Sequence, residues 1–163
     1  LKILQVILSY DYLWLNIRVK GGAYGCMSGF GCSGEGYLVS YRDPNLKETN
    51  DIYEGIPAYL EAFDPDERDM TKYVIGTISN LDAPLTPSVK GSRGLSAYLS
   101  GVTEEMMQTE RDQILGAAKE DIRALAAQVR AVLATGSFCV VGNEEKIEAN
   151  RGMFGEVSSL TRG

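Results

Sequence analysis

The sequence has no histidine among its 163 residues. Imidazole is the most common general base and a frequent zinc ligand in proteins. Its absence excludes Ser/His/Asp and Cys/His catalysis, histidine zinc sites and imidazole acid–base chemistry within the chain. We therefore expect that this polypeptide does not carry out a bond-breaking step alone.

Positive charge and long apolar runs are also scarce. Sixteen Lys and Arg stand against twenty-two Asp and Glu, a formal charge of -6 at pH 7, so the chain lacks a broad basic face for nucleic acid. The apolar start, Leu1–Leu8, is far shorter than the roughly 18 apolar residues that cross a bilayer. The composition, 44% hydrophobic and 23% charged, is typical of one globular domain. We expect neither nucleic acid nor a membrane as a partner.

The chain has only three cysteines, an odd number that argues against a disulfide framework. Five residues separate Cys26 from Cys32, which is not the spacing of a zinc knuckle, and Cys139 lies in an apolar run. We expect small core or half-buried side chains, no metal site and a reducing compartment. A bacterial cytoplasm is the expected location, with an organelle matrix as the alternative.

The two ends suggest a piece of a longer polypeptide. The chain opens at Leu1 inside an apolar helical pattern and stops at Gly163 without a capping signal. We expect residues 1–163 to form one domain, most of the last domain of a larger protein.

Periodicity and turn residues predict an α+β domain, a two-layer α/β sandwich in which helices cover one face of a mostly antiparallel sheet. Three strands make a narrow sheet, so at least one further strand is expected on the N-terminal side. The expected elements are a helix over 1–18 stopped by Gly21-Gly22, strands over 23–30 and 36–42, helices over 52–63, 67–80 and 88–99, a long helix from 103 to 136, a strand over 137–142 and a helical turn over 144–150.

Residues 21–36 are rich in glycine, and Gly29–Gly34 matches the dinucleotide-binding fingerprint literally. That fingerprint requires a helix after it, so that pyrophosphate meets a helix N-terminus. Here the following residues, 36–41, are strand-like. A glycine-rich hairpin is therefore the better interpretation.

Arg18 and Tyr24 flank the double glycine, one at the end of the buried helix and one at the start of a strand. A guanidinium is a fixed charge with a planar fork of donors, and a phenol is a single neutral donor, so the two can converge on one extended ligand. The alternative is structural: Arg18 caps helix carbonyls and Tyr24 is a half-buried strand aromatic.

Three segments together resemble a known enzyme family. The run Tyr12–Gly25, then Ser40-Tyr-Arg-Asp-Pro-Asn45, then Thr49 with Tyr53, resembles the C-terminal half of the pitrilysin/insulinase inverted-zincin metallopeptidases. The chain is most similar to the presequence-protease branch, in which an arginine, two glycines and a tyrosine stand at this spacing. The element order agrees over essentially the whole chain.

The resemblance implies a clam-shell enzyme of four homologous α/β domains, in two halves around a peptide chamber. Their fold is the LuxS/mitochondrial-processing-peptidase-like metallohydrolase fold. Zinc would be held by an H-x-x-E-H helix in the N-terminal half, as expected of a zinc metalloendopeptidase. The present chain would be a catalytically silent last domain, truncated at its N-terminal strand or strands and inactive by itself.

The resemblance also implies roles for five residues. Tyr24 would donate a hydrogen bond to the scissile carbonyl as that group gains negative charge, and Arg18 would fix the peptide. Gly21, Gly22 and Gly25 would let the backbone turn and keep the corner open to substrate.

Three hypotheses follow for the function. The first is a substrate-positioning domain of a zinc oligopeptidase, with the N-terminal catalytic half of the same polypeptide and an unfolded peptide as partners. The second is a purely structural or assembly module of the same fold, like the non-catalytic core subunits of respiratory complexes. The third, ranked last, is binding of a small anionic ligand at the glycine-rich corner. An unpaired sheet edge would also favour self-association.

Overall fold

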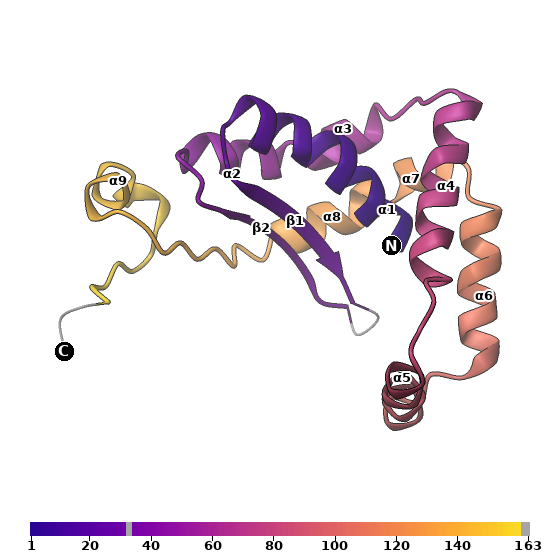
Figure 1. Cartoon of the computed structure of the whole chain (residues 1–163). Coiled ribbons are helices and arrows are strands. Elements are labelled where there is room, and N and C mark those ends of the chain that lie inside the picture. Colours follow the sequence, from indigo (N-terminus) through magenta and orange to yellow (C-terminus); the bar gives the residue numbers. More distant parts are fainter. Residues whose placement is uncertain (32–33, 161–163) are drawn as a thin grey trace.

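The structure, a computed structural model, describes residues 1–31 and 34–160. Figure 1 shows a central body from which one helix projects on one side and a C-terminal arm on the other. The elements are α1 (Lys2–Ile7), η1 (Leu8–Tyr12), η2 (Trp14–Lys20), β1 (Gly25–Phe30), β2 (Gly36–Tyr41), α2 (Lys47–Glu54), α3 (Ile56–Glu61), α4 (Glu67–Leu81), α5 (Pro87–Leu99), α6 (Glu104–Leu115), α7 (Lys119–Ala124), α8 (Ala126–Leu133), α9 (Glu144–Ala149) and η3 (Arg151–Met153).

The first twenty residues form the helix around which the core is built. It starts as α1 and continues through η1 and η2, whose π-type turns are one residue wider than α-helical turns. Apolar side chains face more than one side, as predicted, and pack against β1 and α4. Full burial of each contributes about 1.5–3 kcal/mol. The fully buried side chains of this helix are Leu4, Ile7, Leu8, Leu13 and Ile17.

Strands β1 and β2 pair antiparallel over their full lengths, which confirms the predicted hairpin. The glycine-rich stretch is thus followed by a strand, and the dinucleotide-binding interpretation is excluded by its context. Cys32 and Ser33 lie outside the described residues.

The helices at 67–80 and 88–99 form as predicted, as α4 and α5. The Asp66 carboxylate accepts the amide of Asp69 at 2.8 Å and caps α4. The single helix predicted over 52–63 is wrong. Two helices, α2 and α3, meet at Gly55, and α2 starts five residues earlier than expected. The Tyr12 hydroxyl, which donates to the Ile52 carbonyl at 2.9 Å, occupies the space beside Gly55.

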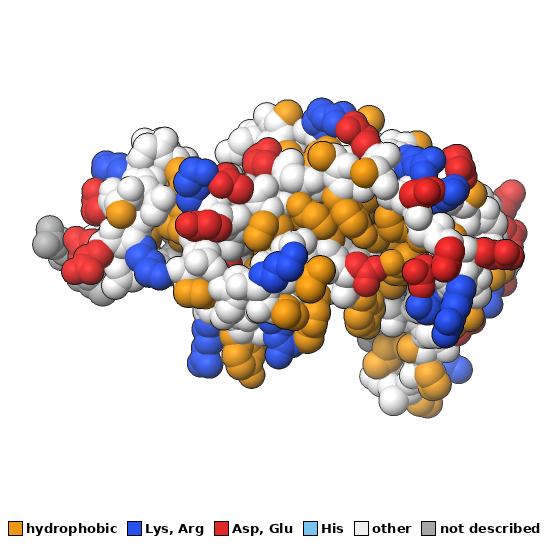
Figure 2. Space-filling view, turned by 90° about the horizontal axis from the view of Figure 1, so that it is seen from above, with side chains coloured by type: hydrophobic (Ala, Val, Ile, Leu, Met, Phe, Trp, Pro, Cys, Tyr) orange, Lys and Arg blue, Asp and Glu red, His pale blue; other side chains and the backbone are white. Residues whose placement is uncertain are grey.

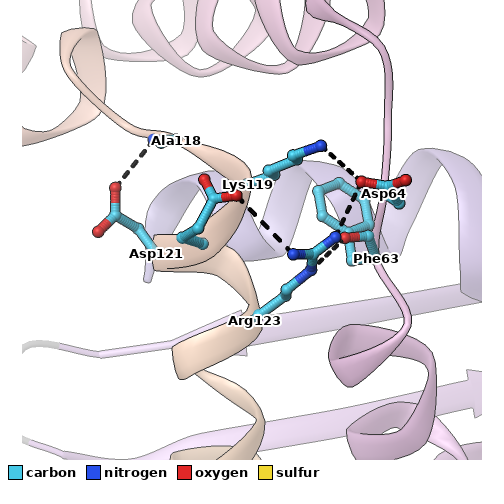
Figure 3. Close-up of polar contacts among 7 residues, drawn as sticks. Phe63, Asp64, Ala118, Lys119, Asp121 and Arg123 are labelled. Carbon is cyan, nitrogen blue, oxygen red and sulfur yellow. Dashed lines mark hydrogen bonds and ion pairs between the residues drawn. The ribbon is translucent and has the colours of Figure 1, made fainter.

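The long helix predicted from 103 to 136 is also wrong, because three helices replace it. α6 ends at Gly116, and α7 begins after Ala118, whose amide donates to the Asp121 carboxylate at 2.8 Å (Figure 3). The break turns α7 and α8 so that Ile122 and Val129 are buried, while Leu115 remains exposed. The apolar stripe is therefore divided among helices that run in different directions (Figure 1).

The strand predicted over 137–142 does not form, and among the described residues the sheet contains β1 and β2 alone. This segment instead runs extended beside β2, with a groove of about 480 Å³ between them. The Lys146 ammonium donates to the Pro44 carbonyl and anchors the far end of the segment. The α+β class is therefore confirmed, with a smaller sheet than predicted.

A polar junction joins the turn before α4 to α7 (Figure 3). The Arg123 guanidinium donates to the Phe63 carbonyl at 2.7 Å and to the Asp64 carboxylate at 2.8 Å. Lys119 donates to the same Asp64 oxygen at 2.6 Å. These bonds join two segments that lie more than fifty residues apart in the sequence.

Candidate functional site

The predicted corner is formed by Gly21 and Gly22 at the end of η2. The Gly22 amide donates to the Arg18 carbonyl at 3.0 Å, and the Ala23 amide donates to the Ile17 carbonyl at 3.1 Å. A Cβ on Gly21 would lie 2.5 Å from that Ile17 oxygen, and Gly22 has a φ of 79°. One glycine is thus required by close packing and the other by backbone conformation.

A second turn, residues 42–45, holds this corner from outside. The Asn45 side-chain amide donates to the Gly21 carbonyl at 2.6 Å. The Asp43 carboxylate accepts the Asn45 backbone amide at 2.9 Å and the buried Thr49 hydroxyl at 2.7 Å. The helix end, the turn and α2 are therefore tied together, and the corner is rigid.

Arg18 lies exposed on the last turn of η2, with its guanidinium 4.0 Å from the centre of the Trp14 ring. A cation over an exposed indole contributes about 0.5–1 kcal/mol. Burial raises the pKa of the Cys26 thiol on β1, and the nearby positive charge of Arg18 partly opposes this shift.

Tyr24 lies on the other side of the corner and is 59% exposed. Its ring meets the Tyr41 ring edge-on, with centroids 5.3 Å apart and planes at 66°. The guanidinium carbon of Arg42 lies 5.4 Å from the Tyr24 centroid. Tyr24 therefore contacts two side chains, and more than half of its surface remains exposed to solvent.

Gly25 has a different role from the two corner glycines. It pairs with Tyr41 across the hairpin, and a Cβ at Gly25 would overlap the Tyr41 ring. Gly29 stands in the same relation to Tyr37, four positions further along the hairpin. Each tyrosine ring therefore lies across a glycine, on the face of the hairpin that points away from the core. We call the exposed apolar side chains of this face, with Tyr24 at their end, the outer row: Tyr24, Met27, Tyr37, Val39 and Tyr41.

The opposite face of the hairpin is covered by the core. Cys26, Phe30 and Leu38 pack there against the buried cluster. Figure 2 shows a different, upper face of the molecule, where hydrophobic side chains gather in the middle and charged ones surround them.

The structure places the predicted pair, Arg18 and Tyr24, on two sides of one corner, both exposed. Their described contacts are separate, since Arg18 lies on Trp14 and Tyr24 lies against Tyr41 and Arg42. The carbonyls of Ile17 and Arg18 accept backbone amides, and the carbonyl of Gly21 accepts the side-chain amide of Asn45. The candidate site is thus the open corner between the Arg18 guanidinium and the Tyr24 hydroxyl, and the described contacts of the two side chains do not join them.

The sequence analysis gave Arg42, Asp43 and Asn45 no role at the site, although the resemblance includes all three. The run Asp43-Pro44-Asn45 signalled a turn. Nothing in the residue types indicated that the turn would fold back onto the double glycine.

Metal binding fits poorly here. Within the described ranges, no group of three or more Cys, Asp or Glu side chains is arranged to hold a metal ion, and the sequence lacks histidine.

No helix in the described part of the chain is long and apolar enough to cross a membrane. The arrangement can donate hydrogen bonds and present a positive charge to a bound chain.

Comparison with known proteins gives a consistent result. The family model "PreP C-terminal domain" matches residues 1–143. HypA of Clostridium perfringens is 46% identical over 99% of the chain, and presequence protease 1 of Arabidopsis thaliana, chloroplastic/mitochondrial, is 39% identical over 87%. The mitochondrial presequence protease of Aspergillus oryzae is 33% identical over 89%. The chain spans only 17%, 13% and 14% of the lengths of these three relatives.

Proposed function

Since the chain belongs to the PreP C-terminal domain family of pitrilysin-like peptidases, we propose that it positions peptide substrates for a larger zinc oligopeptidase and does not itself cleave them. The observation that carries this proposal is the rigid double-glycine corner, which presents the exposed Arg18 and Tyr24 beside an uncovered row of apolar side chains. A corner of this kind suits an extended chain with polar backbone groups and apolar side chains.

Each donor has a distinct task in this proposal. Tyr24 donates its hydroxyl hydrogen to the scissile carbonyl oxygen, an interaction that strengthens as this oxygen gains negative charge. Arg18 binds a backbone carbonyl or a carboxylate of the peptide and fixes its register. The outer row contacts peptide side chains along the hairpin.

The rest of the polypeptide would supply what this chain lacks. The described residues and the histidine-free sequence do not fit zinc, so the metal and the water-activating group belong to an N-terminal catalytic half that faces the corner across a peptide chamber. We propose that residues 1–163 are most of the last of four homologous domains. In the complete fold, a two-layer sandwich, upstream strands would widen the hairpin into a larger sheet. A bacterial cytoplasm, or an organelle matrix, is the proposed compartment.

The decisive experiment is Tyr24→Phe in the full-length protein, assayed on an unfolded peptide. We expect kcat to fall about 10- to 100-fold with KM within about threefold, because the lost bond forms mainly in the transition state. Zinc content should not change. Tyr98→Phe is the control, because Tyr98 is 83% exposed on α5, far from the corner. Full turnover in Tyr24→Phe would contradict the proposed role.

A structural or assembly module is the second candidate. The contact of Arg18 with Trp14 favours it, since this arginine already has an aromatic partner within the chain. In that case Arg18→Ala and Tyr24→Ala, made in the full-length protein, would leave kcat and KM unchanged and would lower only the thermal midpoint.

A further inference from the structure

Arg42 occupies an unusual backbone conformation. Its φ is 48°, and it is the single non-glycine residue with a positive φ in the described part of the chain. The left-handed conformation strains a residue with a Cβ, whereas glycine adopts it freely. An arginine with such a backbone conformation points to a function for its side chain.

That side chain lies on Tyr24. Its guanidinium carbon is 5.4 Å from the ring centroid, within the range of a cation–π contact. The Tyr41 ring also packs against the Tyr24 ring, with centroids 5.3 Å apart. The Tyr24 amide also donates to the Arg42 carbonyl at 3.3 Å, so backbone and side chain of Arg42 both fix Tyr24.

Two other charged side chains of this corner, Asp43 and Arg18, have other partners. Asp43, the adjacent acid, accepts hydrogen bonds from Asn45 and Thr49 and is engaged within the turn. Arg18, the other cation of the corner, lies on Trp14. The two arginines are thus placed on two different aromatic rings.

We propose that Arg42 is a positioning residue for Tyr24, an inference that rests on the proposed function of that phenol. The left-handed backbone directs the guanidinium onto the ring, which limits rotation of an otherwise exposed side chain. The positive charge beside the ring also favours negative charge near the phenol oxygen, and so strengthens the hydrogen bond to a carbonyl oxygen in the transition state.

The test uses Arg42→Met, Arg42→Gly and Arg42→Lys in the full-length protein. Met keeps the aliphatic stem without the charge, Gly also relieves the backbone strain, and Lys keeps a cation. We expect Arg42→Met and Arg42→Gly to lower kcat about threefold to tenfold with KM within about twofold. Arg42→Lys should recover part of this loss. The thermal midpoint of Arg42→Gly should equal or exceed that of the wild type, and Arg93→Met on α5 is the matched control.

A double-mutant cycle separates positioning from direct substrate binding. Because Arg42 acts through the Tyr24 hydroxyl, adding Arg42→Met to Tyr24→Phe should lower kcat no further. Additive losses of kcat, or full turnover in Arg42→Met while Tyr24→Phe is slow, would overturn the role of Arg42 and leave the role of Tyr24 intact. Full turnover in Tyr24→Phe would instead overturn the proposed function on which the role depends.

Discussion

The side-chain amide of Asn45 donates a hydrogen bond of 2.6 Å to the backbone carbonyl of Gly21, across 24 residues of sequence. This bond joins the turn after β2 to the end of the N-terminal helix. With the bond from the Tyr24 amide to the Arg42 carbonyl, it joins the turn after β2 to the corner that carries Arg18 and Tyr24.

Loss of this bond should destabilise the chain. Asn45→Ala removes the donor and leaves the partly buried Gly21 carbonyl without it, which should lower the free energy of unfolding by about 1–2 kcal/mol. Urea denaturation followed by circular dichroism measures the change. Asn80→Ala, at an exposed position of α4, should stay within about 0.5 kcal/mol of the wild type. Equal stability of Asn45→Ala and wild type would show that this hydrogen bond does not stabilise the chain.

Substitution of the corner glycines should distinguish their two roles. Gly22→Ala should cost about 1–2 kcal/mol because its φ is 79°, and Gly22→Asn should cost less because asparagine tolerates this conformation. At Gly21 no residue with a Cβ fits against the Ile17 carbonyl, so alanine and asparagine should be equally harmful. Gly91→Ala, in open space on α5, should be neutral or stabilising. The measurement is the denaturation midpoint, and a milder asparagine at both positions would contradict the assignment.

Gly25 and Gly29 provide a matched pair for testing the path from the hairpin to Tyr24. Each accommodates a tyrosine ring, but only the ring above Gly25, that of Tyr41, contacts Tyr24. Alanine at either position should destabilise the hairpin by about 1–3 kcal/mol through overpacking. In the full-length protein, Gly25→Ala should also lower kcat severalfold, while Gly29→Ala should not. Equal kinetic effects of the two variants would mean that the Tyr41 contact does not position Tyr24.

Local patterns in the sequence were sufficient for much of this structure. The buried helix, its stop at Gly21-Gly22 and the antiparallel hairpin follow from apolar periodicity and glycine placement, which act over a few residues. The cap of α4 by Asp66 is equally local. Arg18 and Tyr24 are both exposed, and their roles at the corner remain predictions.

Features that depend on contacts between distant segments were missed. The break at Gly55 lies beside the hydroxyl of Tyr12, and the predicted long helix is divided so that Ile122 and Val129 are buried. The 137–142 segment has strand-forming residues, but strand formation also requires a partner in register. Arg42 is the clearest case at the site, because its positive φ results from the fold of the turn and leaves no mark in the residue type.

The junction at Asp64 should make stability depend on pH at the acid end. The hydrogen bond and charge of Lys119, with a smaller contribution from Arg123, lower the pKa of the Asp64 carboxyl below its usual range. A carboxyl with a lowered folded-state pKa adds stability above its unfolded pKa of about 3.9, and this stability is lost as the pH falls through the folded value. Asp64→Asn should therefore be less stable than the wild type at pH 7 and equally stable near pH 2.

Asp51→Asn is the matched control, because Asp51 pairs with Lys47 at the same 2.6 Å but within one helix, where such a pair contributes little. We expect a larger shift of the urea midpoint for Asp64→Asn at pH 7, since Asp64 joins α7 to the turn before α4. A difference between Asp64→Asn and wild type that persisted unchanged at pH 2 would show that the ion pairs are not its cause.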